Sequence, residues 1–131
     1  MLKRYDWLDG YLLSKPGAEH DYKIEWQWDR YMLRGKLFAA ICSPDENHRT
    51  YGGHTLINLK CDPRLAEGFQ SQYPDILPGF YTDKRNWIAV LLDGDVPDDV
   101  VRSLCDLSYQ LVLGKLPKYA QREILGDHPK E

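Results

Sequence analysis

The sequence predicts an α+β fold, a two-layer α/β sandwich in which an antiparallel sheet carries helices on one face. Segments with helical spacing occur at residues 2–14, 63–73 and 97–112, and aromatic or β-branched runs fill the stretches between them. The 131 residues are 43% hydrophobic, which suffices for one hydrophobic core. We therefore expect a single domain over residues 1–131, with its core at about 2–125 and a frayed C-terminal tail.

The first 41 residues predict one helix and a hairpin. Apolar side chains recur at helical spacing within residues 2–14, and Pro16-Gly17 oppose continuation of that helix. The chain then turns aromatic and β-branched from Ile24 to Ile41. Arg34-Gly35-Lys36 separates two apolar runs there, so we expect two strands joined by a tight turn.

The middle of the chain predicts a loop, a strand and a helix. Residues 43–54 are polar and rich in turn formers, and we expect a mobile loop. Apolar and polar residues alternate at 55–61, which is typical of a strand with one buried face. Asp62-Pro63 has the pattern of a helix start, and that helix should end before Pro74.

The last third predicts one short strand, one clear strand and the main core helix. We expect the short strand at 80–82 and the clear strand at 87–93. Carboxylates at Asp98 and Asp99 favour a helix start after Pro97, and apolar residues then follow one face as far as Val112. A shorter helical turn should follow Pro117.

Strand alternation divides the predicted sheet into two faces. The helices should cover Ile57, Leu59, Ile88, Val90 and Leu92. The opposite face should then carry Leu56, Asn58, Lys60, Trp87, Ala89 and Leu91. We expect this second face to be open to a partner, because nothing in the sequence predicts a helix to cover it.

Charge and cysteine content indicate a cytoplasmic protein. The formal charge is −3, which excludes the overall basic surface of a dedicated duplex-binding protein. Cys42, Cys61 and Cys105 are odd in number and form no CxxC pair, so buried free thiols fit better than disulfides. No apolar run reaches the length of a membrane span, and we expect no membrane association.

Several segments resemble one family of small bacterial proteins in their order along the chain. They are KPGAE at 15–19, RGKLFAAI at 34–41, LKCDPRLAE at 59–67 and PGFYTDKRNWIAVLLDGDVPDDVVRSLCDLSYQLV at 78–112. The chain resembles the MmcQ/YjbR family on these residues. The polar insert at 43–54 and the aromatic Trp26-Gln27-Trp28 depart from its shorter members.

The resemblance implies a fold and a function. The implied element order is α-β(3)-α-β(2)-α, similar to secretion chaperones and described as CyaY-like. Members of the family are commonly labelled DNA-binding through a double-wing arrangement of hairpins, which is itself an inference from the fold.

Nucleic-acid binding needs cations for phosphates and aromatic faces for bases. The candidate set is Arg34, Lys36, Lys60, Lys84, Arg85 and Trp87. The simpler interpretation is that Lys84 and Arg85 belong to a solvated loop and that Trp87 is packed. Because Asp83, Asp93 and Asp95 would repel phosphates, we expect binding to DNA to be weak and salt-sensitive.

Other chemistry has little support in the sequence. The four histidines stand far apart and the cysteines have no ligand spacing, so we expect no metal and no cofactor. No nucleophile elbow or nucleotide-binding glycine motif occurs, and we expect no enzymatic activity. Tyr109 fills core space or lines a cleft beside the last helix. The alternative function is a protein-interaction or chaperone-like module that uses the open sheet face around Trp87, Leu91 and Leu56 to bind a protein partner or a second copy.

Overall fold

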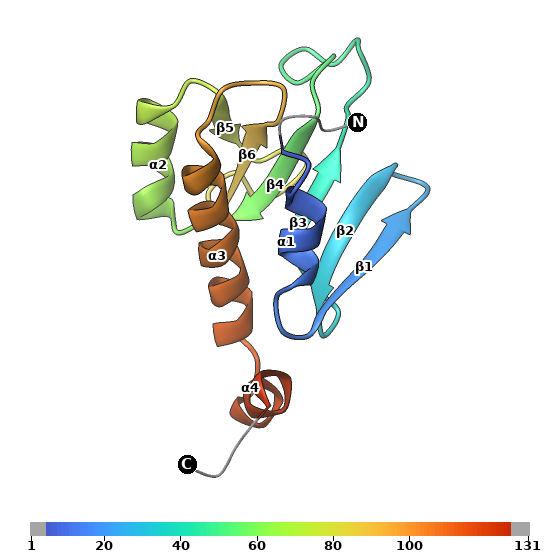
Figure 1. The fold of residues 1–131 in the computed structure, drawn as a ribbon. Coiled ribbons are helices and arrows are strands. Elements are labelled where there is room, and N and C mark those ends of the chain that lie inside the picture. Colours follow the sequence, from blue (N-terminus) through green and yellow to red (C-terminus); the bar gives the residue numbers. More distant parts are fainter. Residues whose placement is uncertain (1–4, 127–131) are drawn as a thin grey trace.

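The computed structural model describes residues 5–126, which form four helices and a six-stranded sheet (Figure 1). The elements are α1 (Leu8–Leu13), β1 (Ala18–Lys23), β2 (Trp28–Leu33), β3 (Lys36–Cys42), β4 (Leu56–Lys60), α2 (Pro63–Gln72), β5 (Ile76–Pro78), β6 (Trp87–Leu91), α3 (Asp98–Gly114) and α4 (Lys118–Leu125). The strands pair antiparallel in the order β1-β2-β3-β4-β6-β5. The helices lie on one side of this sheet, which confirms the predicted α+β class.

The structure contains a strand that the sequence pattern did not predict. β1 pairs with β2 along its whole length, from Ala18 opposite Leu33 to Lys23 opposite Trp28. Its residues AEHDYK are exposed except at the two ends, so the strand has no apolar alternation to detect. Charged side chains on such an edge strand oppose pairing with other molecules. Four strands, one more than the implied three, therefore precede α2.

Some elements begin or end at residues other than those predicted from the sequence. The helix predicted at 2–14 begins only at Leu8, after a turn at 5–7, and residues 2–4 lie outside the described part of the chain. The strand predicted at 80–82 is wrong, because the short strand is β5 at Ile76–Pro78. The prediction of a helix start at Asp62 is confirmed, since its carboxylate accepts the Arg64 backbone N–H at 2.8 Å. The tail at 127–131 also lies outside the described residues.

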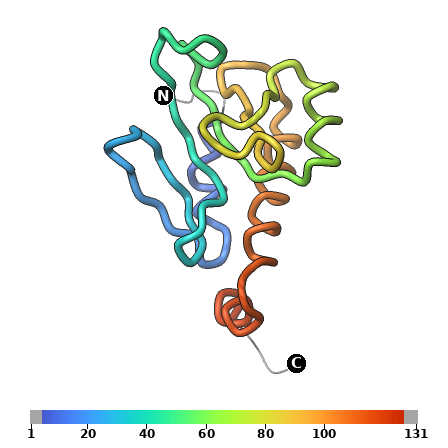
Figure 2. The backbone as a smooth tube through the Cα atoms, turned by 180° about the vertical axis from the view of Figure 1, so that it is seen from behind, coloured from blue at the N-terminus to red at the C-terminus, as the bar shows by residue number. Residues whose placement is uncertain are grey.

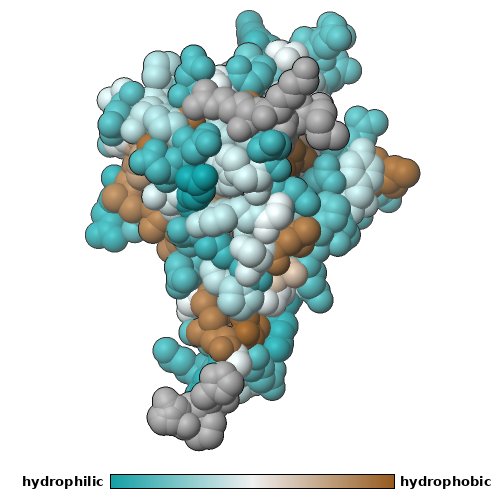
Figure 3. Space-filling model, viewed as in Figure 1, coloured by the Kyte–Doolittle hydropathy of each residue, from teal (hydrophilic) through white to brown (hydrophobic). Residues whose placement is uncertain are grey.

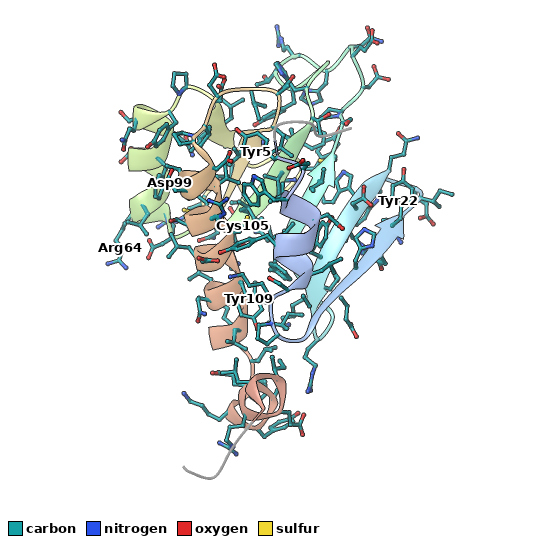
Figure 4. All side chains as sticks on the ribbon, viewed as in Figure 1. Tyr5, Tyr22, Arg64, Asp99, Cys105 and Tyr109 are labelled. Atoms are coloured by element: carbon teal, nitrogen blue, oxygen red, sulfur yellow. The ribbon has the colours of Figure 1, made fainter. Side chains whose placement is uncertain are left out.

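The main core lies between the helices and the sheet. Tyr5, Cys105 and Tyr109 are buried there and point into this layer in Figure 4. The five residues predicted to face the helices, Ile57, Leu59, Ile88, Val90 and Leu92, all belong to it, as predicted. The Tyr109 hydroxyl donates to the Pro16 carbonyl at 2.6 Å, which explains this residue by packing and one hydrogen bond.

A β-bulge in β3 shapes this core. The register between β2 and β3 shifts at Tyr31/Met32, so that Tyr31 lies opposite Ala39 and Met32 opposite Leu37. The extra residue is Phe38, which is fully buried in the same core as Ala39. A bulge allows two consecutive side chains to face one side of a sheet. Phe38 therefore reaches the helices without reversing the rest of the strand.

The second face of the sheet is covered, so the prediction of an open face there is wrong. Leu56, Ala89 and Leu91 are at most 7% exposed and form a second apolar cluster with Tyr51 and Phe80. Those two aromatic residues come from the loops at 43–55 and 79–86. Figure 2, viewed from behind, shows the yellow 79–86 loop in front of the sheet. Side chains from two loops cover this face, whereas the sequence pattern predicts only helices as covering elements.

The surface on the helix side agrees with a composition in which 28% of the residues are charged. The helix side is mostly hydrophilic, and its apolar residues form separate patches (Figure 3). The three cysteines are buried and free, as predicted. Across residues 5–126, no helix is both long and apolar enough to cross a membrane.

Candidate functional site

A groove of about 600 Å³ lies at the second face of the sheet, between the β1–β2 turn and the two covering loops. We call it the aromatic groove. It is lined by Glu25, Trp26, Gln27, Trp28, Leu37, Cys42, Ser43, Pro44, Asp45, His48, Phe80, Tyr81 and Thr82. A volume of this size falls in the range of small-molecule sites, which are concave and mostly apolar with a few polar groups.

Aromatic rings follow one another along the groove. The ring centroids of Trp26 and Trp28 are 5.2 Å apart, and those of Trp28 and Phe80 are 6.3 Å apart. The ring centroid of Phe80 lies 4.5 Å from that of Tyr81 and 5.2 Å from that of His48. Trp26 and Tyr81 are 54% and 76% exposed, so aromatic surface remains free at the rim.

Buried Asn58 holds the loop that supplies Phe80. Its side-chain oxygen accepts the Phe80 N–H at 2.8 Å, and its amide donates to the Phe80 carbonyl at 2.9 Å. Asn58 is fully buried in β4, where strand alternation directs it to the second face. The Asn58 side chain thus forms hydrogen bonds with both the backbone N–H and the backbone carbonyl of a loop residue 22 positions away.

Two further features fix the same loop. Gly79 has no space for a side chain, because an added Cβ would lie 2.1 Å from Thr82 Oγ1 and 2.7 Å from Trp87 Cβ. The Lys84 ammonium donates to the Gly79 carbonyl at 2.7 Å. The loop is therefore held in one arrangement before any ligand arrives.

The other covering loop is organised by His48. Its Nδ1 accepts the backbone N–H groups of Thr50 and Tyr51, each at 3.3 Å. Since these groups can only donate, a neutral His48 ring carries its proton on Nε2. The Tyr51 hydroxyl donates to the Pro78 carbonyl and ties this loop to the end of β5, where the 79–86 loop begins. The segment expected to be mobile is thus tied down by hydrogen bonds.

Backbone strain is concentrated at the groove. Of three non-glycine residues with positive φ in the described chain, Gln27 (φ 59°) and Tyr81 (φ 51°) line it. This left-handed conformation costs free energy for residues with a side chain, and it is retained where the surroundings enforce it. The strain accompanies the two turns that present Trp26 and Tyr81.

The predicted nucleic-acid set is divided by the fold. Arg34, at the β2–β3 turn, pairs with Glu123 of α4 at 2.8 Å, on the helix side. Lys60 lies over the Trp87 ring at 5.5 Å, and these residues are register partners in β4 and β6. The Lys84 ammonium donates a hydrogen bond to the Gly79 carbonyl. The fold therefore engages Arg34 and Lys84 in other contacts and brings Lys60 together with Trp87.

Four members of the set are exposed, namely Arg34, Lys36, Lys84 and Arg85, whereas Lys60 and Trp87 are half-buried. Arg85 follows Asp83, whose pKa is lowered mainly by a hydrogen bond from the Asn86 side chain. Asp83 is therefore an anion at neutral pH, and it would oppose phosphate close to Arg85. Near Trp87 the cations Lys60 and Arg85 therefore lie close to the negative charge of Asp83.

The reactive groups near the groove are not activated. Burial raises the pKa of the Cys42 thiol to about 12, so this sulfur is protonated at neutral pH and is a poor nucleophile. Burial also raises the pKa of Tyr51. Within residues 5–126, no group of three or more His, Cys, Asp or Glu side chains is placed to hold a metal ion.

Sequence reasoning missed most of the groove. In the sequence Trp26-Gln27-Trp28 stands out only as a departure from the family pattern, and no motif gives Phe80 or His48 a role. One signal was available in Asn58, a polar residue in the middle of a buried apolar strand, which must find hydrogen-bond partners somewhere. The identity of those partners depends on the course of a distant loop.

A single antiparallel sheet with helices on one face and an aromatic groove on the other defines this chain as a small α+β protein with a built cavity. The family model YjbR matches residues 13–111, and the chain belongs to the YjbR family. It is 32% identical over 108 residues to the uncharacterised protein YjbR of Escherichia coli K12, covering 82% of this chain and 86% of that protein. It is 31% identical over 122 residues to the uncharacterised Bacillus subtilis protein YyaQ, covering 85% and 98%.

Solved structures agree on the fold. A crystal structure of the Deinococcus radiodurans protein DR2400 superimposes with a TM-score of 0.78 at 24% identity, over 99% of this chain and 93% of that one. A crystal structure of a Pseudomonas syringae protein gives 0.68 at 25% identity, over 83% and 97%. The α+β architecture is therefore shared beyond this chain.

Proposed function

We propose that this protein is a non-enzymatic binding protein and that the aromatic groove is its binding site. The observation that carries the proposal is a concave, ring-lined cavity whose loops are held by buried hydrogen bonds. The raised pKa of the Cys42 thiol favours binding over covalent chemistry. A pre-organised apolar cavity binds a ligand at a smaller entropic cost than a mobile one.

Protein-observed NMR with a library of small aromatic fragments tests this proposal. We expect bound fragments to shift the indole N–H signals of Trp26 and Trp28, because both rings line the groove. Tyr81→Ala should weaken binding about five- to tenfold, since one aromatic contact contributes about 1 kcal/mol. Tyr119→Ala, which removes another exposed tyrosine on α4, is the control and should change nothing. Shifts outside the groove with no effect of Tyr81→Ala would contradict the proposal.

Nucleic-acid binding is the second candidate function, favoured by the contact of Lys60 with the Trp87 ring at 5.5 Å and by exposed Arg85 beside it. A base stacked on Trp87 would place its phosphate near these cations. The third candidate, a chaperone-like module on the sheet face, loses two of its three named contacts, because Leu56 and Leu91 are buried.

Fluorescence anisotropy with labelled single-stranded and duplex DNA tests the second candidate. Two phosphate contacts, one each from Lys60 and Arg85, predict that affinity for a single strand falls about 17-fold between about 20 and about 150 mM salt. The double variant Lys60→Ala/Arg85→Ala should reduce binding and flatten this salt dependence. Lys115→Ala/Lys118→Ala removes the same charge elsewhere and serves as the control. Absence of binding at low salt would exclude the candidate.

A further inference from the structure

The charged residues that line the aromatic groove are acidic. They are Glu25 and Asp45, and neither lysine nor arginine lines the groove among the described residues. We propose that the groove binds a small organic cation, with the cationic group against the aromatic rings and the negative charge of Asp45 close by. This inference rests on the proposed function and specifies the chemical class of the ligand.

The rings provide the surface that such a cation requires. Trp26 and Trp28 meet edge to face at an interplanar angle of 66°, whereas Phe80 and Tyr81 are tilted by only 31°. The face of an aromatic ring carries negative electrostatic potential, and tryptophan attracts cations most strongly. Trp28 is 6% exposed and Trp26 is 54% exposed, so Trp26 offers most of the tryptophan surface to a quaternary or alkylated ammonium group.

Cations of the protein already lie near one of these rings. The Lys23 ammonium is 5.4 Å and the Arg30 guanidinium 5.9 Å from the centroid of Trp26. Lys23 lies 3.7 Å from the Glu25 carboxylate, and Arg30 is bound to Asp21 at 2.6 Å. Glu25 thus has a cationic side chain of the protein, Lys23, beside its carboxylate.

Asp45 is the uncompensated charge of the lining. Its Oδ1 accepts the Asn47 backbone N–H at 2.8 Å, and within residues 5–126 it has no ion-pair partner. An anionic ligand such as a phosphate would meet this carboxylate. A cation in the groove would instead gain a favourable Coulomb interaction that is stronger than in bulk water, because the walls are apolar.

Two probes of almost the same shape test the charge requirement. Para-hydroxyphenyl-trimethylammonium is a cation, and para-tert-butylphenol is its neutral isostere. We expect the cation to bind about tenfold more tightly in an NMR titration that follows the indole signals of Trp26 and Trp28. Asp45→Asn should weaken binding of the cation about three- to tenfold and leave the neutral probe unchanged. Glu67→Gln on α2 removes the same charge away from the groove and is the matched control.

The outcomes separate this inference from the proposed function. Equal or tighter binding of the neutral probe, with the same indole shifts, would overturn the charge preference and leave the groove as a binding site. Insensitivity of the cation to Asp45→Asn would overturn the role of that carboxylate. Failure of both probes, together with failure of every fragment, would overturn the groove itself.

Discussion

Replacing Asn58 with leucine is expected to lower the free energy of unfolding by about 3 kcal/mol, because it leaves the Phe80 N–H and carbonyl without their partners. Leucine has the branched heavy-atom skeleton of asparagine but larger methyl groups, so no cavity is left and any overpacking adds to the cost of the unpaired polar groups. For a chain of this length the change corresponds to a Tm lower by about 10 °C. Urea denaturation and calorimetry provide the measurement.

The same substitution should also disturb the groove. Phe80 contacts both Trp28 and His48, so release of its backbone frees the 79–86 loop. We expect broadening of the Trp28 signals by NMR and weaker fragment binding. Asn47→Leu makes the same change at an exposed position and should cost less than about 0.5 kcal/mol. A loss below about 1 kcal/mol for Asn58→Leu would show that water replaces the amide.

Ser108→Ala is the second substitution with a large expected effect. Fully buried Ser108 connects α3 to two strands, donating its hydroxyl to the Phe38 carbonyl and accepting the Lys60 backbone N–H at 2.9 Å. Phe38 is the bulged residue of β3, and Lys60 ends β4. A bulge disrupts the regular ladder, so the side chain supplies a bond that the ladder lacks.

Removing this hydroxyl should lower the free energy of unfolding by about 2 to 3 kcal/mol, since a buried acceptor and a buried donor both lose their partner. Amide hydrogen exchange should become faster at Lys60, which reports the loss directly. Ser103→Ala, an exposed serine on the same helix, is the control and should leave stability within about 0.5 kcal/mol. A cost as small as that of Ser103→Ala would mean that the bulge is held by packing alone.

Elements with strong apolar periodicity were predictable from the sequence. The β2–β3 hairpin, β4, α2, β6 and α3 all occur where the patterns placed them. The helix-facing alternation of β4 and β6 was also correct, because one face of a strand must be apolar to enter a core. β1 was missed for the converse reason, since an exposed edge strand needs no apolar residues.

The candidate site was much less predictable. Proximity in a chain says little about which cations share a surface, and the fold directs Arg34 to Glu123 and Lys84 to Gly79. The groove joins a turn near Trp26, a loop at His48 and a loop at Phe80, which are separated by many residues. Such long-range convergence leaves no periodic trace in any one segment.

The sequence by itself determined the α+β class, the helix-facing core and the family, because these follow from local periodicity and from motifs in a fixed order. Only the tertiary structure decided the state of the second face. The polar loops cover it through buried Tyr51 and Phe80, and their backbone groups are satisfied by a distant asparagine. Hydrogen-bond partners of buried groups are set by the path of the whole chain, so the groove exists only in the folded protein.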